Sequence, residues 1–218
     1  MRSGFASLIG RPNAGKSMLL NRLVGTKLAI VSDKPQTTRN RILAVARLTG
    51  NPTGQVVFLD TPGIHRPLHR MNVRMVQSAL ETISSVDVLV VVIDASVKVG
   101  AGDRYVLTQL EGATVPLVLA LNKIDLIRKN QLLPLIEWYR QQRDFAVIVP
   151  VSALTGDGQK ELECAIGEQL PEGAPLYPED YLTDQPERHL AAEMVREKIL
   201  WYTSAELPFS TSERIAWL

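Results

Sequence analysis

Cysteine is almost absent from this chain of 218 residues, in which Cys164 is the only one. A single cysteine cannot close an internal disulfide, and we expect a reducing, cytoplasmic setting for the protein. Apolar runs long enough to cross a bilayer are also missing, because the run VDVLVVVIDA is too short to span one. The apolar stretch near the N-terminus is likewise too short for the central part of a signal peptide. The sequence therefore supports neither export nor membrane insertion.

Strong net charge is a third absence. The formal net charge is +1, so the total gives no drive toward nucleic acid or membrane. The distribution is nevertheless uneven, since residues 34–74 hold seven Lys or Arg and one acidic residue, whereas residues 157–193 hold ten acidic residues and two basic ones. The chain is therefore charge-polarised, with a basic segment followed later by an acidic one.

Hydrophobic residues make up 45% of the chain, enough for one well-buried α/β domain and a small appendage. Short apolar runs alternate with longer stretches of helical spacing. We expect strands at residues 4–9, 41–48, 55–60, 87–94, 115–122 and 145–152, and helices at 16–24, 71–83, 105–111, 131–140 and 158–170. This alternation predicts an α/β fold with a mostly parallel six-stranded sheet flanked by helices on both faces.

The composition changes after residue 170. Prolines at positions 171, 175, 178 and 186 predict a non-helical connector over residues 171–185. Pro186 is suited to the first turn of a further helix. The apolar members of that helix are Ala191, Met194, Val195, Ile199 and Tyr202. Because of this stripe, we expect the helix to pack on another surface.

The segment GRPNAGKS follows the first predicted strand and precedes the first predicted helix. It matches the pattern G-x-x-x-x-G-K-[ST], whose glycines let backbone N–H groups turn toward phosphate oxygens. Lys16 adds a positive charge for the phosphates, and Ser17 adds a hydroxyl for Mg²⁺. The predicted phosphate-binding residues are Gly10, Arg11, Pro12, Asn13, Ala14, Gly15, Lys16 and Ser17. This loop alone does not separate kinases, ATPases and GTPases.

The segment NKID follows a predicted strand at its carboxyl end, where open α/β sheets bind ligands. An ionised Asp125 can accept hydrogen bonds from the N1–H and the exocyclic amine of guanine, and adenine offers neither donor at that edge. The segment therefore favours GTP over ATP, with Asn122, Lys123 and Asp125 as base-binding residues. Ser152 and Ala153 follow the next predicted strand, and we expect the Ala153 N–H to meet guanine O6.

The segment DTPG ends a third predicted strand. We expect Asp60 to hold Mg²⁺ through water and the Gly63 N–H to contact the γ-phosphate, because glycine permits a close backbone approach. The segment KPQTTRNR offers a threonine to the metal and the γ-phosphate, and we prefer Thr38 over Thr37. The metal ligands predicted in this way are Ser17, Thr38 and Asp60.

These motifs, in the order P-loop, threonine, DTPG, NKxD and SA, resemble the translation-factor-related class of P-loop GTPases. The segments GRPNAGKS, KPQTTRNRI, DTPGIHRP, LNKIDL and YPEDYLTDQPERHLAAEMVREKIL are similar to the Era family of bacterial ribosome-assembly GTPases over nearly the whole chain. The resemblance implies GTP hydrolysis to GDP with Mg²⁺, coupled to maturation of the small ribosomal subunit. It also implies a G domain over residues 1–170, a linker over 171–185 and the first helix and start of a KH domain over 186–218.

In that family the KH domain binds the 3′ end of 16S rRNA, and this chain departs from the family there. A KH domain carries a G-x-x-G loop that clamps nucleic-acid backbone, and this pattern occurs nowhere in the 218 residues. We therefore expect a truncated, α+β KH-like segment without its RNA-gripping half, so that the small ribosomal subunit and 16S rRNA are partners by resemblance only. Peripheral membrane association is a further property of the family, and nothing else in the sequence supports it.

The second departure concerns catalysis, because Ile64 stands where many GTPases have a glutamine that orients the attacking water. Some relatives with this apolar replacement use a P-loop asparagine to hold K⁺ near the phosphates, which implies that role for Asn13. An ordinary loop-forming role for Asn13 is the alternative. The residues expected to act on the γ-phosphate are Lys16, Thr38, Gly63 and Asn13. For the whole chain, the alternative is a nucleotide-binding switch without appreciable hydrolysis or RNA binding.

The basic segment at residues 34–74 spans both predicted switch regions. One interpretation is a nucleotide-dependent contact with rRNA or an acidic partner. The other is a solvated positive surface close to the triphosphate, which is the simpler account and the one we favour.

Overall fold

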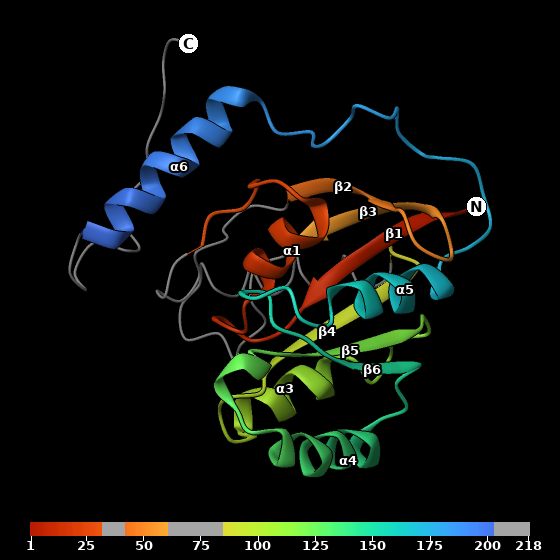
Figure 1. Cartoon of the computed structure of the whole chain (residues 1–218), viewed down its shortest axis with the longest axis vertical. Helices are drawn as coiled ribbons and strands as arrows, with labels where there is room; N and C mark the ends of the chain where they lie inside the picture. Colours follow the sequence, from red (N-terminus) through yellow and green to blue (C-terminus); the bar gives the residue numbers. More distant parts are fainter. Residues whose placement is uncertain (32–41, 61–84, 203–218) are drawn as a thin grey trace.

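The computed structural model describes residues 1–31, 42–60 and 85–202. Its centre is a six-stranded sheet with the strand order β2-β3-β1-β4-β5-β6 (Figure 1). The strands are β1 (Arg2–Ile9), β2 (Ile42–Leu48), β3 (Gly54–Asp60), β4 (Val88–Asp94), β5 (Leu117–Asn122) and β6 (Val147–Pro150). Neighbouring strands are parallel, except that β2 and β3 are antiparallel. The predicted mostly parallel six-stranded sheet is confirmed.

The described helices are α1 (Lys16–Val24), α3 (Ala101–Gln109), α4 (Leu132–Gln142), α5 (Gln159–Gln169) and α6 (Glu187–Tyr202), with short 3₁₀ turns at Ile124–Leu126 and Lys129–Gln131. Most agree with the predicted ranges to within two residues. Helix α3 is the exception, because it begins at Ala101 rather than at residue 105. The Asp103 carboxylate accepts a hydrogen bond from the Gly100 N–H at 2.8 Å, and this N-terminal cap is not visible in apolar spacing. The helix predicted at 71–83 lies outside the described residues.

Each central strand is buried on both faces, as its continuous apolar sequence requires. Alternate side chains of β4 belong to two separate core clusters. The first cluster includes Val88, Val90 and Val92 of β4, Leu19 and Leu20 of α1, and Leu162 and Ile166 of α5. The second includes Leu89, Val91 and Ile93 of β4, Val106 and Leu107 of α3, and Tyr139 of α4. Helices α1 and α5 therefore cover one face of the sheet, and α3 and α4 cover the other (Figure 1).

Residues 171–186 contain no helix, as their prolines predict, and they run along the edge strand β2. The Val45 N–H donates to the Leu182 carbonyl oxygen at 2.8 Å, and the Thr183 hydroxyl donates to the Leu43 carbonyl oxygen at 2.6 Å. The buried side-chain amide of Gln55, in β3, exchanges hydrogen bonds with the backbone of residues 176 and 177. This connector therefore satisfies outward-facing backbone groups of β2.

Helix α6 begins at Glu187, directly after Pro186, and packs on the described residues through a face other than its apolar stripe. Two members of the expected apolar stripe, Met194 and Val195, are 42% and 49% exposed, and Tyr202 is 86% exposed. The buried residues of the helix are Ala192, Arg196, Glu197 and Leu200. The inward face thus carries two charged side chains.

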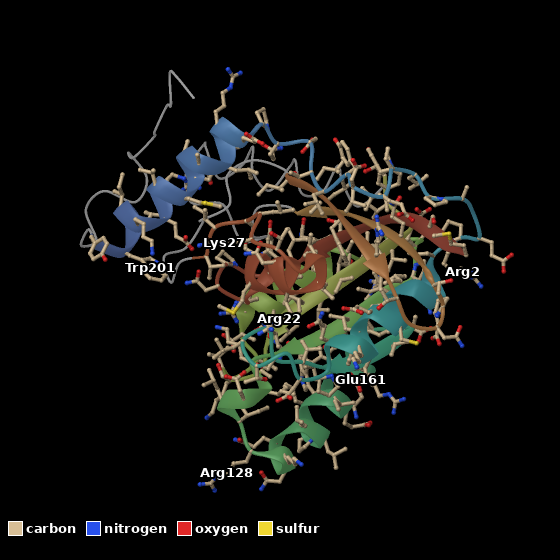
Figure 2. The ribbon with its side chains drawn as sticks, turned by 45° about the horizontal axis from the view of Figure 1, so that its top comes forward. Arg2, Arg22, Lys27, Arg128, Glu161 and Trp201 are labelled. Atoms are coloured by element: carbon tan, nitrogen blue, oxygen red, sulfur yellow. The ribbon has the colours of Figure 1, made fainter. Side chains whose placement is uncertain are left out.

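Pairing explains why these charges can be buried. Glu197 forms an ion pair with Lys27, which lies between α1 and α6 (Figure 2), and accepts a hydrogen bond from the Val31 N–H at 3.1 Å. Arg196 donates two hydrogen bonds to Glu193, at 2.9 and 2.5 Å. A buried charge is tolerated when it is paired and hydrogen-bonded, and apolar periodicity cannot anticipate such pairs. Within the part of the chain that the structure describes, no helix, α6 included, is both long and apolar enough to cross a membrane.

Candidate functional site

The predicted motifs meet at one edge of the sheet. Strands β1, β3, β4, β5 and β6 run parallel, so their carboxyl ends lie together. GRPNAGKS follows β1, DTPG begins at the end of β3, NKID begins at the end of β5, and the SA pair follows β6. Strand β1 lies at the centre, with β3 on one side and β4 on the other, and such a switch point is where open α/β sheets bind ligands.

The loop between β1 and α1 has a backbone shape that depends on glycine. Gly15 has a φ of 91°, and a Cβ there would lie 2.2 Å from Nδ2 of Asn122. A Cβ on Gly10 would lie 2.2 Å from the Val92 carbonyl oxygen. Asn13 also lies in the left-handed region, with a φ of 63°. The loop thus bends tightly into the N-terminus of α1, where backbone N–H groups and the helix dipole favour an anion.

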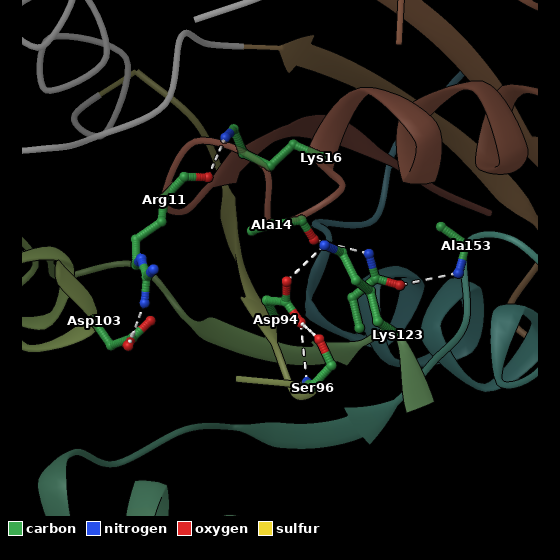
Figure 3. Close-up of polar contacts among 9 residues, drawn as sticks. Arg11, Ala14, Lys16, Asp94, Ser96, Asp103, Lys123 and Ala153 are labelled. Atoms are coloured by element: carbon green, nitrogen blue, oxygen red, sulfur yellow. Dashed lines mark hydrogen bonds and ion pairs between the residues drawn. The ribbon is translucent and has the colours of Figure 1, made fainter. Parts of the chain in front are cut away.

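Lys16 lies at the start of α1 and is only 7% exposed. Its Nζ donates to the Gly10 carbonyl oxygen at 3.2 Å. It also donates to the Arg11 carbonyl oxygen at 2.9 Å (Figure 3). The loop's own carbonyl groups therefore hold the ammonium group above the bend. This position suits a point charge that neutralises phosphate oxygens.

The predicted metal ligands come from separate elements. Ser17 lies in the first turn of α1, and Asp60 ends β3, where it pairs in register with Leu8 of β1. A hydroxyl and a carboxylate are the hard oxygen donors that Mg²⁺ prefers, so this donor set fits that ion. Thr38 and Gly63, which were also predicted to act here, lie outside the described residues.

Asn122 joins the phosphate loop to the base-binding segments. Its side chain is buried, and its Nδ2 donates to the Ala14 carbonyl oxygen at 2.9 Å. Its Oδ1 accepts a hydrogen bond from the Ala153 N–H at 3.0 Å. The Ala153 N–H, which we expect to meet guanine O6, thus also supplies the donor that the buried amide oxygen needs. One amide group thereby links β5, the P-loop and the loop after β6.

Asp125 is exposed and lies in the short 3₁₀ turn after β5. Its Oδ1 accepts a hydrogen bond from the buried Ser152 hydroxyl at 2.6 Å. The Ser152 oxygen itself accepts from the Thr155 N–H at 3.1 Å, which fixes the hydroxyl. No hydrogen bond among the described residues engages Oδ2 of Asp125, so that oxygen is available to a ligand.

A pocket of about 390 Å³ lies between these segments. The predicted residues that line it are Asn13, Gly15, Asn122, Lys123, Asp125 and Ala153. Sequence reasoning missed its apolar lining, which is Met18, Val31, Leu126 and Leu154. The 63% exposure of Leu154, directly after the SA pair, has a reason here, since an apolar wall suits the faces of a planar base. A pocket with apolar walls and one carboxylate matches a purine that carries two adjacent donors.

Two acidic residues that the motifs do not include also contact the site. Asp94, at the end of β4, lies 2.6 Å from Nζ of Lys123. Asp103, in the first turn of α3, lies 2.7 Å from Nη1 of Arg11 in the P-loop (Figure 3). The Arg11 side chain lies over Gly102, where a Cβ would come within 3.0 Å of its Cδ and Nε. The sequence contains one indication that Asp94 lies at the site, because Asp94 ends an apolar strand as the motif residues do.

Tyr139 of α4 is fully buried, and within the described residues its hydroxyl has no hydrogen-bond partner. Burial raises the pKa of this hydroxyl, and the negative charge of Asp103 raises it further, although Arg11 acts in the opposite direction. The hydroxyl is therefore protonated at neutral pH. It does not supply a titrating group to the site.

Fold and pocket together define the class of this protein as a P-loop GTPase. The family described as "50S ribosome-binding GTPase" matches residues 5–123, more than half of the chain. The GTPase Era of Geobacter metallireducens is 46% identical over 214 residues, which cover 98% of this chain and 71% of that protein. The chain belongs to the Era family of GTPases.

Solved structures agree with this assignment. The crystal structure of Era in complex with MgGDPNP and nucleotides 1506–1542 of 16S ribosomal RNA has a TM-score of 0.90 and 40% identity, covering 96% of this chain and 70% of that one. The crystal structure of an Era variant from Aquifex aeolicus bound to GDP and AlF4⁻ has a TM-score of 0.89 and 40% identity, covering 96% of this chain and 71% of that one. The described residues therefore have the fold of the corresponding part of Era.

Proposed function

We propose that this GTPase binds GTP and GDP in the pocket around Asp125, hydrolyses GTP with Mg²⁺, and acts as a nucleotide-dependent switch in assembly of the small ribosomal subunit. One observation carries the proposal. The buried amide of Asn122 bonds both Ala14 of the phosphate loop and Ala153 of the base loop, so the two halves of a nucleotide site form one hydrogen-bonded unit. Such preorganisation lowers the entropy lost on binding.

Asp125 selects the purine in this proposal. Ser152 holds one carboxylate oxygen, and the other faces the N1–H and exocyclic amine of guanine. Adenine presents no donor at that edge and leaves the carboxylate unpaired. A site of this kind rejects the analogue that lacks the hydrogen-bonding groups by a factor on the order of 10⁴.

The P-loop residues 10–17 hold the phosphates, with Lys16 as the charged partner of the outer phosphates. Ser17, Thr38 and Asp60 are the proposed holders of Mg²⁺, which supplies charge neutralisation at the transferred phosphate when bound. The Gly63 N–H is the proposed γ-phosphate contact. These residues bind and orient the triphosphate for attack by water.

Asn13 is the proposed ligand for a monovalent cation. Its backbone has a φ of 63° and its side chain is exposed at the rim of the pocket. An amide oxygen is a suitable donor for K⁺, and a cation there supplies transition-state charge that other GTPases obtain from an arginine.

The ribosomal role rests on relatives. The similar Era structure was solved with a 16S rRNA segment, and we infer the small ribosomal subunit and that rRNA as partners here. We also infer a G domain over residues 1–170, a linker over 171–185 and the beginning of a KH domain over 186–218. The G-x-x-G loop that clamps nucleic-acid backbone is absent from these residues, so RNA affinity of this chain by itself is expected to be weak.

Single-turnover GTP hydrolysis with Mg²⁺, in KCl and in NaCl at equal ionic strength, tests the enzymatic proposal. Wild-type protein is expected to release phosphate above the rate without enzyme, and faster in KCl. Lys16→Ala is the matched variant and is expected to lose triphosphate binding, because the other cation of the loop, Arg11, is paired with Asp103.

Each contrary outcome removes a defined part of the proposal. Equal rates in the two salts remove the K⁺ site. Tight GTP binding without phosphate release identifies a binding-only switch, and equal affinity for ATP and GTP removes the assignment of Asp125.

A further inference from the structure

Asp94, which belongs to none of the sequence motifs, contacts a residue of the base pocket. Asp94 ends β4 and pairs in register with Asn122, the last residue of β5. Lys123 follows immediately, and it adopts the left-handed conformation with φ 66° and ψ 35°. A lysine in that conformation requires compensation from its surroundings. The side chain forms an ion pair, in which Nζ of Lys123 lies 2.6 Å from Oδ2 of Asp94 (Figure 3).

Both carboxylate oxygens of Asp94 are engaged. Oδ2 accepts from Lys123, and Oδ1 accepts from the Ser96 N–H at 2.9 Å and from the Ser96 hydroxyl at 2.5 Å. Burial alone raises the pKa of Asp94, but the hydrogen bonds from Lys123 and Ser96 outweigh it and hold that pKa below its ordinary value. The group is therefore a carboxylate at neutral pH, and the turn after β4 fixes its orientation.

Anchoring the ammonium group restricts the whole Lys123 side chain. Its backbone lies in the base pocket, which Lys123 lines together with Asp125 and Leu126. Its Nζ is fixed at the neighbouring strand, so the four-carbon stem spans the distance between them. A free lysine loses considerable rotamer entropy when it is ordered against a ligand, and the ion pair with Asp94 reduces this loss because it restricts the Lys123 side chain within the protein itself.

We propose that Asp94 is a positioning residue for guanine nucleotides, which acts through Lys123 by holding its side chain extended along the base pocket. The inference rests on the proposed function, because it concerns the same pocket. It assigns Asp94 to the nucleoside part of the ligand rather than to the phosphates. Loss of the Asp94 carboxylate is therefore expected to lower the affinity for GDP and the affinity for GTP by the same factor.

Asp94→Asn is a sharp test, because an amide cannot replace this carboxylate. Both oxygens face donors, so the NH₂ group of the amide is directed at either the Ser96 N–H or the Lys123 ammonium. The expected result is a rise in Kd on the order of tenfold for both GDP and GTP, with an unchanged single-turnover rate at saturating GTP. Titration with fluorescent GDP and GTP analogues measures the two affinities.

Two matched variants separate positioning from a general structural defect. Ser96→Ala removes one donor to Oδ1 and leaves the Lys123 contact, so its nucleotide affinity is expected to stay within about twofold of wild type. Asp87→Asn makes the same chemical change at the opposite end of β4, where the carboxylate accepts from the Phe5 N–H at 2.8 Å. It is expected to lower thermal stability without a selective effect on nucleotide affinity.

A double-mutant cycle with Lys123→Met decides the mechanism. If Asp94 acts through Lys123, adding Asp94→Asn to Lys123→Met causes no further loss. The proposal is overturned if the loss is the same in both backgrounds, if Asp94→Asn binds like wild type, or if Lys123→Met retains full affinity. Failure of the wild-type protein itself to bind GDP or GTP is a different result, and it overturns the proposed function.

Discussion

At the scale of single residues, polar groups of the base pocket are held by hydrogen bonds to one another and to neighbouring backbone groups. Asn122 spans Ala14 and Ala153, and Ser152 holds one oxygen of Asp125. Each of these bonds fixes a rotamer that a flexible site has to order on binding. Hydrogen bonds among the residues of the protein therefore shape the pocket.

Asp125→Asn is expected to change the preferred base from guanine to xanthine. Ser152 can still donate to the amide oxygen, which leaves the NH₂ group toward the ligand, where xanthine offers a carbonyl in place of the guanine amine. Affinity for GDP is expected to fall by a factor of about 100 or more, because donors then face each other. Competition between GDP and xanthosine diphosphate measures the change.

Asp157→Asn is the control for this substitution. It changes an exposed carboxylate in the loop between β6 and α5, the loop that contains Ser152. This carboxylate accepts a hydrogen bond from the Thr155 hydroxyl at 2.9 Å and does not line the pocket. It should leave base preference unaltered. A preference for GTP that survives Asp125→Asn contradicts the role given to that carboxylate.

Residues within one loop could be predicted from the sequence, and residues that meet across the fold could not. The P-loop glycines and Asp125 follow from spacing, because their chemistry is local to one turn. Asp94 and Asp103 contact the site through partners 29 and 92 positions away in the sequence. No spacing rule covers such pairs, since strand order decides which of them meet.

At the scale of secondary-structure elements, α6 shows that a helix can be docked by charges as well as by apolar contacts. Glu197 bonds Lys27 and the Val31 N–H, and the Trp201 Nε1 donates to the Val31 carbonyl oxygen at 3.3 Å. Side chains of α6 therefore form hydrogen bonds with both the N–H and the carbonyl oxygen of Val31. Its apolar residues Met194 and Val195 are correspondingly left outside.

Glu197→Gln is expected to loosen α6. Both carboxylate oxygens accept from donors, so an amide leaves one of its NH₂ hydrogens opposed to Lys27 or to the Val31 N–H. The expected loss is about 1 to 2 kcal/mol in the free energy of unfolding, which is reduced because Lys27 is half-exposed. Urea denaturation followed by far-UV circular dichroism measures it.

Glu179→Gln is the matched control, because Glu179 is almost fully exposed and lies 3.8 Å from Arg47. It should unfold at the same urea concentration as wild type. Equal midpoints for the Glu197 and Glu179 variants contradict the docking role of Glu197.

Apolar periodicity predicted where most helices lie but not how each one ends or packs. Helix α3 starts earlier than predicted because the side chain of Asp103 caps it. The inward face of α6 contains charges because their partners come from α1 and the segment after it. In both cases the deciding interaction is a polar one that a hydrophobicity pattern does not record.

At the scale of the whole molecule, the site is assembled from segments spread over nearly the full G-domain sequence. Residues from positions 13 to 154 line one pocket, and the strands behind them belong to a single sheet. The alternation of strands and helices predicted this architecture. The strand order and the antiparallel β2 were not predictable, because both depend on tertiary pairing between apolar strands of similar composition.

Binding of a guanine nucleotide is expected to stabilise the whole folded protein against unfolding. A ligand at about 100 times its Kd adds about 2.7 kcal/mol to the free energy of unfolding if it binds the folded state alone. For a protein of this size that corresponds to a rise in Tm of about 5 to 10 °C. Thermal denaturation with and without GDP and Mg²⁺ measures it, and ATP is the control that should have no such effect. An equal shift with ATP argues against guanine selectivity.

The connector along β2 also bears on how copies of the protein behave at high concentration. An uncovered edge strand is a template on which another chain can add its own strand. Here Leu182 and Thr183 already occupy the backbone groups of β2, so an incoming chain has to displace them first. The segment that leads to α6 is thus a built-in barrier to intermolecular strand addition and to the aggregation that begins with it.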